Sequence, residues 1–199
     1  MTAALTLFSQ HGYDRVTVGD ICKEAGANQA SVNYYFRGKA GLYRECWQHA
    51  CDRFGEELLS GGEADPPEIQ LGHYIRALMK NFMDPGEKGY FNRLYMMELV
   101  RPTGLIGNGW LERVRPRRER LHRIIGRIMG RTAETETVVL CELSIASLCR
   151  NLLTVNPGDL ASFLGRPVDQ AMIDRMVAHV TAFALAGIRA VGAGQGNAP

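Results

Sequence analysis

The chain has 199 residues, a net charge of +2 and 46% hydrophobic residues, which is enough for one extended or two small domains with a buried core. Its five cysteines contain no C-x-x-C pair, and we recognise no secretory signal and no long apolar run. These features argue against a disulfide scaffold and a membrane protein, so we expect a cytoplasmic protein with reduced thiols and no membrane partner.

Residues 17–43 predict two short helices around a tight turn. Thr17 is a suitable N-cap, because Asp20 stands three positions later, where a carboxylate suits the N–H groups and the dipole of the first turn. Gly26 follows the last residue of an apolar stripe and can adopt a positive φ. We therefore expect the first helix to begin at Thr17 and the chain to turn at Gly26.

The second of these helices is predicted to begin after Asn28, another suitable N-cap. At about 100° per residue, the positions after Asn28 divide into two faces. Val32 and Tyr35 are expected to point inward, toward Ile21. The outward set is predicted to be Gln29, Ala30, Asn33 and Tyr34.

The outward side chains suit recognition of a DNA major groove. A carboxamide can pair with adenine through two hydrogen bonds, and a small methyl group can touch the thymine methyl. Hydroxyl and ammonium groups are common donors to phosphates. We therefore predict base contacts by Gln29, Ala30 and Asn33, phosphate contacts by Tyr34, Lys39, Thr17 and Ser31, and Asn28 as a further member of this DNA-binding set.

The same region resembles the N-terminal domain of the TetR family of bacterial transcriptional regulators. The resemblance rests on an LF-x-x-x-GY-x-x-x-T segment from Leu7, an AG turn at Ala25 and a YYF-x-x-K-x-x-L block from Tyr34. It covers roughly residues 3–50. It implies a helix-turn-helix domain over residues 1–48, a ligand-binding and dimerisation domain over residues 49–199, and an all-α fold.

One departure from the family pattern concerns the N-terminus. Family members usually carry a basic arm before the first helix, whereas this chain begins within that helix at Met1. Residues 1–49 hold five basic and four acidic side chains, a local charge of only +1. Since nonspecific DNA affinity follows the number of neutralised phosphates, we expect either a longer natural N-terminus or weak binding that depends on dimerisation.

The rest of the chain is predicted to be helical, with turns at Gly and Pro. A helix over residues 42–59 should leave the DNA-binding domain. Pro67 suits the first turn of a helix ending at residue 83. The segment NPGDLASFLGRP is expected to connect the last two long helices. The helices predicted after residue 59 cover residues 67–83, 90–100, 110–130, 136–153 and 169–191.

The helix predicted over residues 110–130 is rich in arginine, which also allows a second nucleic-acid contact. An apolar stripe from Leu111 to Ile128 lies opposite these arginines, so we expect many of them to occupy the solvated face of a core helix. Anion recognition in a ligand pocket and contact with a partner remain open.

The last two long helices combine small and apolar residues, such as Ser144 and Ser147 on one and Ala182 and Phe183 on the other. Small residues let helices approach closely. We expect these helices to form a homodimer interface. In the resembled family, they make a four-helix bundle between subunits, and the twofold axis places two reading helices about 34 Å apart on a palindromic operator.

The MELVRPT segment, the arginine-rich helix and the two closing helices also resemble a TetR subgroup with a CecR-like C-terminal domain. An unknown small-molecule effector is then expected in a largely apolar pocket between the middle helices. Glu98 and His122 are the most telling candidates, because inward titratable groups are paired or used. For Glu98, the alternative is a structural salt bridge to a nearby arginine. The predicted pocket residues are Tyr74, Leu78, Phe82, Phe91, Tyr95, Glu98, His122, Met129 and Asn151.

The most consistent function is a repressor that a small molecule releases from its operator. One alternative is a DNA-binding regulator without a small-molecule ligand, responsive to a partner or to oxidation of Cys141 and Cys149. Another is a helical small-molecule carrier. No nucleophile elbow, acid pair or phosphate loop is present, so we expect no enzyme activity and no cofactor. Cys46, His49 and Cys51 lie close in sequence but not on one helix face, so no metal site is expected.

Overall fold

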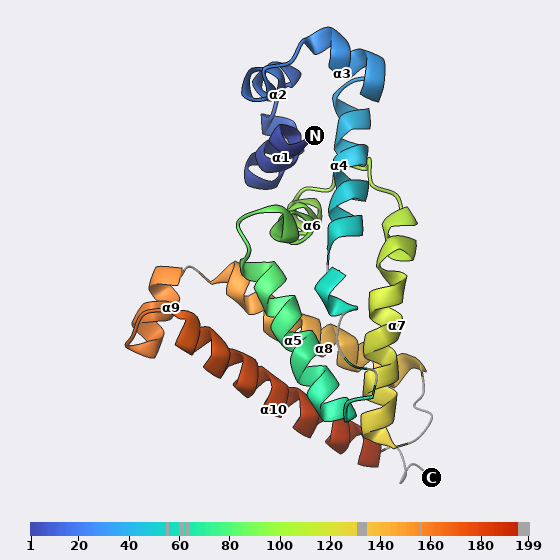
Figure 1. Cartoon of the computed structure of the whole chain (residues 1–199), viewed down its shortest axis with the longest axis vertical. Coiled ribbons are helices and arrows are strands. Elements are labelled where there is room, and N and C mark those ends of the chain that lie inside the picture. Colours follow the sequence, from blue (N-terminus) through green and yellow to red (C-terminus); the bar gives the residue numbers. More distant parts are fainter. Residues whose placement is uncertain (55, 60–61, 63, 131–134, 156, 195–199) are drawn as a thin grey trace. The chain divides into compact units, whose positions relative to one another are not determined.

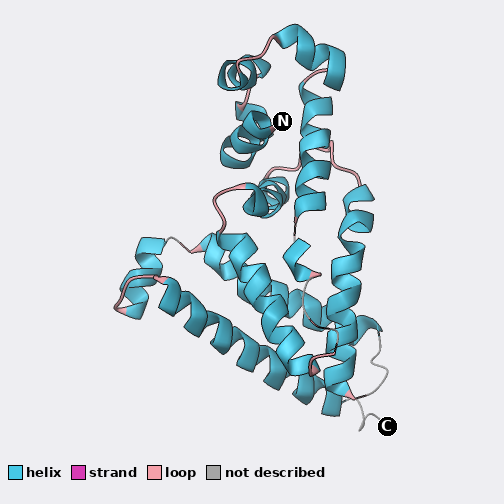
Figure 2. Cartoon of the chain, in the orientation of Figure 1, coloured by secondary structure: helices cyan, strands magenta, loops and turns pink. Residues whose placement is uncertain are grey.

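The computed structural model describes residues 1–199 except 55, 60–61, 63, 131–134, 156 and 195–199. Within the described residues, the regular structure is helical and contains no strand, as Figure 2 shows. The predicted all-α fold is confirmed.

The chain forms two compact units, and each unit is made of two separate segments of the sequence. The N-terminal unit comprises Met1–Glu56 and Asp84–Arg115, and the C-terminal unit comprises Glu57–Met83 and Pro116–Pro199. The N-terminal unit thus takes in a segment that follows the first helix of the C-terminal unit. The predicted functional boundary at residue 48 stays a prediction.

The N-terminal unit is built from four consecutive helices, one later helix and the first residues of another. Its elements are α1 (Thr2–Arg15), α2 (Val18–Ala25), α3 (Gln29–Phe36), α4 (Lys39–Arg53), η2 (Glu87–Gly89), α6 (Tyr90–Val100) and residues 109–115 of α7 (Gly109–Met129). Gly12 interrupts the helical geometry of α1 with φ 77° and ψ 169°. α6 packs on α1 and α4, so it belongs to the core of this unit (Figure 1).

An aromatic core holds the N-terminal unit together. Tyr43 of α4 lies fully buried, with its ring centroid 5.0 Å from that of Phe8 and 5.0 Å from that of Tyr13. Further along α4, Trp47 meets Phe91 of α6 at 5.6 Å with nearly perpendicular rings. Perpendicular and offset rings are the favoured aromatic arrangements, so α4 is fixed to both α1 and α6 by shape as well as by burial.

The C-terminal unit packs α5, α8 and α10 against one another. Its elements are α5 (Pro67–Met83), the remainder of α7, α8 (Thr135–Thr154), α9 (Pro157–Leu164) and α10 (Gln170–Gly194), while η1 (Glu56–Leu58) lies at the sequence boundary between the units. Its core includes Leu71 and Ile75 of α5, Ile124 and Ile125 of α7 and Ile145 of α8, each at most 2% exposed.

Several predicted elements are confirmed and two need correction. α5 and α6 have the predicted bounds, whereas α4 ends at Arg53, before the predicted residue 59. The predicted connection NPGDLASFLGRP contains α9, which begins at Pro157 and carries Asp159 in its first turn. Proline needs no N–H in the first turn of a helix, so Pro157 starts a helix where a break was expected.

The expected solvated arginine face of α7 is only partly present. Arg117 and Arg120 are 7% and 9% exposed, and the Arg120 guanidinium donates to the backbone carbonyl of Leu59. Arg118 pairs with Glu142 of α8. These arginines therefore belong to the packing of the C-terminal unit.

Candidate functional site

A reciprocal cap closes the N-terminus of α2. The hydroxyl of Thr17 accepts a hydrogen bond from the Asp20 backbone N–H at 3.1 Å. The Asp20 carboxylate accepts from the Thr17 hydroxyl at 2.6 Å and from the Thr17 backbone N–H at 2.9 Å. These bonds from Thr17 hold the pKa of Asp20 below its ordinary value. The predicted N-cap is confirmed, and the Thr17 hydroxyl proton is engaged within the chain.

The turn between α2 and α3 also forms as predicted. Gly26 adopts the left-handed conformation with φ 60° and ψ 32°, which glycine tolerates without a Cβ clash. The Ala27 N–H donates to the Cys22 carbonyl at 2.9 Å. Asn28 then caps α3, because its Oδ1 accepts from the Ala30 N–H at 2.9 Å.

The exposed surface of α3 holds most of the predicted DNA-binding set. Val32 is 6% exposed and faces the core of the N-terminal unit. The Gln29 carboxamide leans over Gly19 of α2, where a Cβ would lie 3.4 Å from Gln29 Nε2. We define the outer face of α3 by its exposed residues Gln29, Ala30, Ser31, Asn33 and Tyr34.

Tyr35 does not pack inward, and this expectation was wrong. It is 73% exposed and lies edge-to-face with Tyr34 at 5.0 Å between centroids. Phe36, one residue later, packs against the core instead. Val32 and Phe36 are four residues apart and share a helix face, so the inner stripe was misassigned by one position. Tyr35 is therefore a further exposed hydroxyl beside the outer face of α3.

Lys39 occupies a defined position at the start of α4. Arg37 and Gly38 have positive φ values of 57° and 95°, which turn the chain sharply between α3 and α4. The Lys39 Nζ lies 4.1 Å from the centroid of the Tyr13 ring. An ammonium over an aromatic face is attracted by the ring quadrupole. This contact holds the predicted phosphate-binding cation over the Tyr13 ring of α1.

The geometry of α2 and α3 suits contact with DNA. A single short helix presents two carboxamides, one methyl group and a tyrosine hydroxyl on one side, and an α-helix fits the width of a major groove. The capped turn fixes this helix against α2. Which of these side chains touch bases or phosphates stays a prediction.

Six of the nine predicted pocket residues lie in the C-terminal unit. Tyr74, Leu78 and Phe82 are 8%, 5% and 5% exposed on α5. Burial, and then the charge of Glu142, raise the pKa of Tyr74 above its ordinary value. His122 and Met129 are partly buried on α7, while the side chain of Asn151 on α8 lies outside the described residues.

The other three predicted pocket residues, on α6, belong to the N-terminal unit. Phe91 and Tyr95 are stacked at 6.0 Å between centroids. Glu98 accepts hydrogen bonds from Tyr43 Oη at 2.8 Å and from the Thr103 hydroxyl and N–H at 2.8 and 3.0 Å. Glu98 is thus bonded to a tyrosine and a threonine, where a salt bridge to an arginine was the alternative. Whether the nine residues form one pocket stays a prediction.

His122 belongs to an ion-pair network of α7 and α8. Glu142 accepts from Arg118 Nε at 2.6 Å and Arg118 Nη2 at 2.8 Å, and His122 Nε2 lies 2.7 Å from Glu142 Oε2. Burial alone would raise the pKa of Glu142, but the bonds to Arg118 and His122 outweigh it and lower that pKa. The inward histidine is therefore paired.

Three hollows of the N-terminal unit have volumes of about 220, 250 and 310 Å³. The first lies between the end of α1 and the end of α6, the second beside α4 and the start of α7, and the third between α1 and α2. None of these three is lined by a predicted pocket residue.

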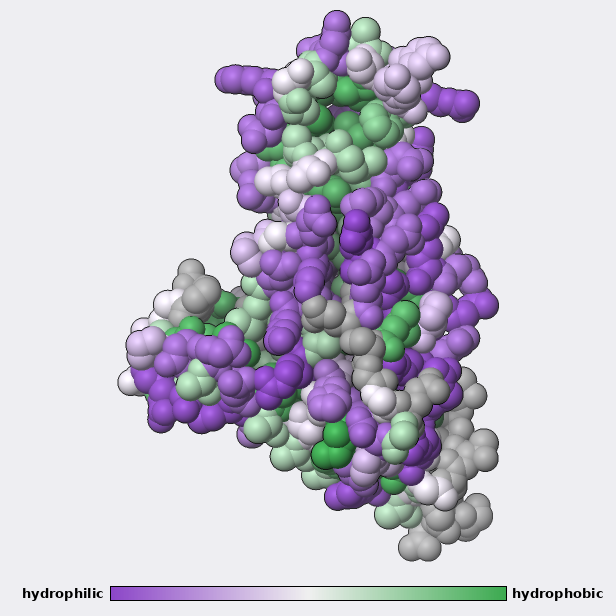
Figure 3. Space-filling model, viewed as in Figure 1, coloured by the Kyte–Doolittle hydropathy of each residue, from purple (hydrophilic) through white to green (hydrophobic). Residues whose placement is uncertain are grey.

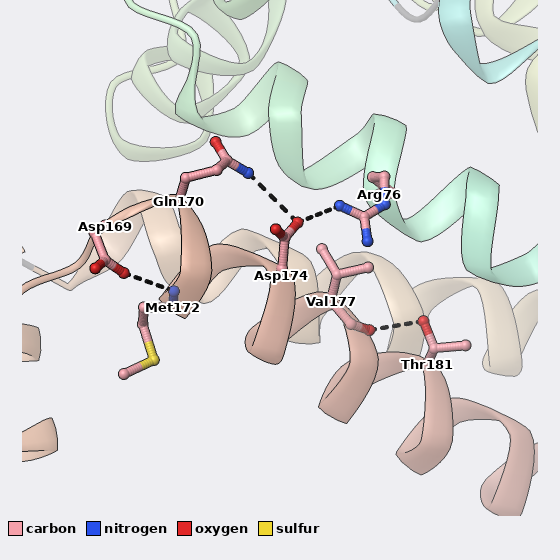
Figure 4. Close-up of polar contacts among 7 residues, drawn as sticks. All are labelled: Arg76, Asp169, Gln170, Met172, Asp174, Val177 and Thr181. Atoms are coloured by element: carbon pink, nitrogen blue, oxygen red, sulfur yellow. Dashed lines mark hydrogen bonds and ion pairs between the residues drawn. The ribbon is translucent and has the colours of Figure 1, made fainter.

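Polar contacts fix the first half of α10. Asp174 accepts from Arg76 of α5 and, at 3.4 Å, from Gln170, as Figure 4 shows. The Asp169 carboxylate accepts from the Met172 N–H at 2.8 Å at the start of the helix. The hydrogen bond from Arg76 lowers the pKa of Asp174. One side of α10 is therefore held against α5.

The exposed surface of α10 carries apolar and small residues together with Arg175, His179 and Arg189. Phe183 and Val191 are 61% and 44% exposed, and Leu140 and Leu143 of the adjacent α8 are 56% and 54% exposed. On the face that Figure 3 displays, hydrophobic residues reach the surface among hydrophilic ones. By length and composition alone, the stretch Gln170–Ala193 is long and apolar enough to cross a membrane, whereas no long apolar run was expected from the sequence. Of its most apolar window, 22% is buried. We call the exposed apolar and small residues of these two helices the α8–α10 face. Besides the four large residues above, it comprises Ser144, Ser147, Ala178, Ala182, Ala186 and Ala190.

The cysteines give no sign of a metal or redox centre. All five are buried thiols, and burial raises the pKa of Cys46 and Cys149 to about 12, which leaves little reactive thiolate. Among the residues that the structure describes, no group of three or more His, Cys, Asp and Glu could hold a metal ion.

Curated relatives match parts of the chain. The biofilm operon icaADBC HTH-type negative transcriptional regulator IcaR of Staphylococcus epidermidis is 38% identical over 102 residues, which are 51% of this chain and 52% of that protein. The HTH-type transcriptional dual regulator CecR of Shigella flexneri is 39% identical over 58 residues, 29% of this chain and 26% of that protein. The chain thus spans about half or less of the length of these relatives.

Solved structures share the fold over nearly the whole chain. The fatty acid degradation regulator FadR from Bacillus halodurans has a TM-score of 0.65 at 18% identity and covers 92% of this chain and 90% of its own. The ketosteroid transcriptional regulator KstR2 of Mycobacterium tuberculosis has a TM-score of 0.60 at 16% identity, with coverages of 93% and 90%. At these identities the likeness concerns the fold alone.

Two family models match adjacent parts of the chain. Residues 1–46 match the model described as bacterial regulatory proteins, tetR family. Residues 67–188, more than half of the chain, match the C-terminal domain of the HTH-type transcriptional dual regulator CecR. The chain therefore belongs to the TetR family of bacterial transcriptional regulators, in the group with a CecR-type C-terminal domain.

Proposed function

We propose that this protein is a repressor that binds a palindromic operator as a homodimer and leaves it when a small molecule binds. The observation that carries the proposal is the outer face of α3, which presents carboxamides and hydroxyls on a helix capped by Asn28 and preceded by the capped helix α2. Repression is supported by the match to IcaR, which is named a negative regulator.

The proposal assigns two kinds of DNA contact. Gln29, Ala30 and Asn33 read base edges, because carboxamides and methyl groups distinguish base pairs in the major groove. Phosphate contacts set the position of α3 on the duplex without reading sequence. The residues assigned to phosphates are Ser31, Tyr34 and Lys39, and Asn28 is a further member of the DNA-binding set. Thr17 is not assigned to a phosphate, because its hydroxyl and its N–H both donate to Asp20.

Dimerisation is proposed to use the α8–α10 face. This surface combines small residues, which allow close helix packing, with exposed Leu140, Leu143 and Phe183. Exposed apolar patches on a folded chain mark interaction surfaces. A second copy of the chain would cover both helices through the same surface, as twofold symmetry requires.

Release is proposed to follow from unequal affinity of the effector for two conformations. α4 begins three residues after α3 ends, so a tilt of α4 moves α3 with it. A hundredfold preference of the effector for the non-binding conformation corresponds to about 2.7 kcal/mol of coupling, which a few contacts can supply. The predicted pocket residues around Tyr74 and His122 are the proposed site of this effector.

Gel-shift titration with DNA from the promoter of the gene itself tests base reading. The double variant Gln29→Ala/Asn33→Ala should lose sequence-specific binding. At about 1–3 kcal/mol per bidentate pair, each lost carboxamide should weaken binding by about fivefold to 150-fold. The matched control Gln10→Ala/Asn108→Ala removes an exposed glutamine and an exposed asparagine elsewhere in the same unit. Unchanged binding of the first variant would show that α3 does not read bases through these groups.

The effector requires a separate screen. Operator DNA bound to the protein is exposed to a library of small molecules, and release is measured for each compound. A compound that releases the wild-type protein but binds less tightly after Tyr74→Ala would support the proposed pocket. Equal affinity for both proteins would place the effector elsewhere.

A further inference from the structure

The hollow of about 250 Å³ beside α4 has no role in the proposed function, but its lining combines aromatic and charged side chains. Its lining includes Trp47 and Gln48 of α4, Trp110 of α7, and the guanidinium-bearing Arg44 and Arg113. All of its lining residues belong to the N-terminal unit. None of the predicted pocket residues is among them.

Aromatic rings form a firm wall of this hollow. The Trp47 and Trp110 centroids are 6.3 Å apart, and Trp47 is 3% exposed while Trp110 is partly exposed. Behind them, Phe91 lies 5.6 Å from Trp47 and 6.0 Å from Trp110. A ring already held by other rings offers contact area at little cost in conformational entropy.

The charged residues that line this hollow are two arginines, Arg44 and Arg113, of which Arg113 is ion-paired. Arg113 Nη1 donates to Asp52 at 2.8 and 2.9 Å, which fixes the guanidinium, whereas Asp52 does not line the hollow. The exposed Arg44 side chain makes no hydrogen bond or ion pair with any residue that the structure describes. A guanidinium matches a carboxylate through two parallel hydrogen bonds.

We propose that this hollow binds a small planar aromatic carboxylate. The ring lies against Trp110, the carboxylate is held by Arg44 and Arg113, and Gln48 supplies a further polar contact. The volume of about 250 Å³ is close to the lower end for ligand pockets, which suits one or two fused rings. Binding alone is independent of the proposed function.

Control of DNA binding from this hollow would rest on the proposed function. α4 supplies Arg44, Trp47 and Gln48, and the same helix follows α3 after only Arg37 and Gly38. A ligand held between α4 and the start of α7 therefore changes the free energy of any α4 movement within the N-terminal unit. We expect the aromatic carboxylate to alter operator affinity through this helix.

Benzoate is the test ligand, and tryptophan fluorescence is the readout. The chain has two tryptophans, and both line the hollow, so occupancy should change the emission directly. We expect saturable change with benzoate, at least about tenfold weaker binding of the uncharged benzamide, and no saturable response to hexanoate. Equal binding of benzamide would overturn the anion site, and an equal response to hexanoate would overturn the aromatic requirement.

Arg44→Glu and Arg53→Glu form a matched pair of variants. Both replace an exposed arginine of α4, but only Arg44 lines the hollow. We expect benzoate affinity to fall at least about tenfold in Arg44→Glu and to remain within about twofold of wild type in Arg53→Glu. Equal affinities of the two variants, or no saturable binding to wild type, would overturn the site.

Operator binding is then measured with and without saturating benzoate. A changed affinity in wild type but not in Arg44→Glu supports control through α4. If benzoate binds and operator affinity stays constant, control from this hollow is wrong although the site is present. If the protein does not bind its promoter at all, the proposed function fails while the fluorescence result still decides the site.

Discussion

A Cβ placed on Gly41 would lie 1.6 Å from the carbonyl oxygen of Phe36. Gly41 is in the first turn of α4 and Phe36 is the last residue of α3, so this contact joins the two helices on which the proposed DNA interface depends. The contacted atom belongs to the backbone and cannot rotate away. No side chain fits at position 41 unless the connection between α3 and α4 moves.

Gly41→Ala should therefore destabilise the N-terminal unit. Helix propensity alone favours alanine over glycine by about 1 kcal/mol, but overpacking against a backbone atom costs about 1–3 kcal/mol or more, so the steric term prevails. We expect a lower free energy of unfolding in urea and weaker operator binding. Gly126→Ala is the control, since it lies in α7 with no atom within 4 Å of the added Cβ and should be neutral or stabilising. A stable Gly41→Ala variant with unchanged operator binding would contradict this account.

The features predicted correctly from the sequence are mainly local ones. The Thr17–Asp20 cap, the Gly26 turn and the Asn28 cap each depend on residues within three positions of one another. Their hydrogen bonds follow from residue type and spacing, so no knowledge of the rest of the fold is needed.

The errors arise where the environment of a side chain depends on the exact phase of a helix or on a partner far away in the sequence. Tyr35 was assigned inward because a helix of eight residues shows too few turns to separate it from Phe36. The partners of Glu98 include Tyr43, which is 55 positions away, and the acceptor of Arg120 is the Leu59 carbonyl, 61 positions away. Periodicity shows that a side chain is inward, but it cannot name such partners.

Lys39 should contribute to the salt dependence of DNA binding. Its ammonium is held over the Tyr13 ring, and Lys39 begins α4 three residues after α3 ends. Each phosphate neutralised contributes about 0.9 to the slope of log affinity against log salt concentration. We expect Lys39→Gln to reduce that slope by about 0.9 for each protomer and to lower the affinity for all DNA sequences by a similar factor. Lys80→Gln, on α5, is the control and should leave the slope unchanged, whereas an unchanged slope for Lys39→Gln would remove Lys39 from the phosphate contacts.

Glu142→Gln should weaken the C-terminal unit in a pH-dependent way. The variant loses the charged acceptor of Arg118 and His122, and removal of one partner from a half-buried network costs about 1–3 kcal/mol. Because the folded pKa of Glu142 lies below its ordinary value of 4.5, the carboxylate stabilises the fold above that value. This contribution is lost as the pH falls through the lowered pKa.

Urea unfolding over a series of pH values measures this effect. Wild type and Glu142→Gln should differ at neutral pH and converge in acid, where both carry a neutral group at position 142. Glu119→Gln changes an exposed glutamate of α7 and serves as the control. A difference that persists unchanged at acid pH would mean that packing, and not the ion pairs, is what the substitution disturbs.

Phe183→Glu tests the α8–α10 face as the dimer interface. Phe183 is 61% exposed, and a charge there would be buried without a partner if a second chain covers it. We expect sedimentation to show a shift from dimer to monomer, with the helical content of the chain retained. Ile69→Glu is the matched control, because Ile69 is 51% exposed on α5, outside this face. Two α3 helices must be held about 34 Å apart to engage a palindrome, so Phe183→Glu should lose far more affinity for the full operator than for a half-site. A Phe183→Glu protein that remains dimeric would assign the interface to another surface.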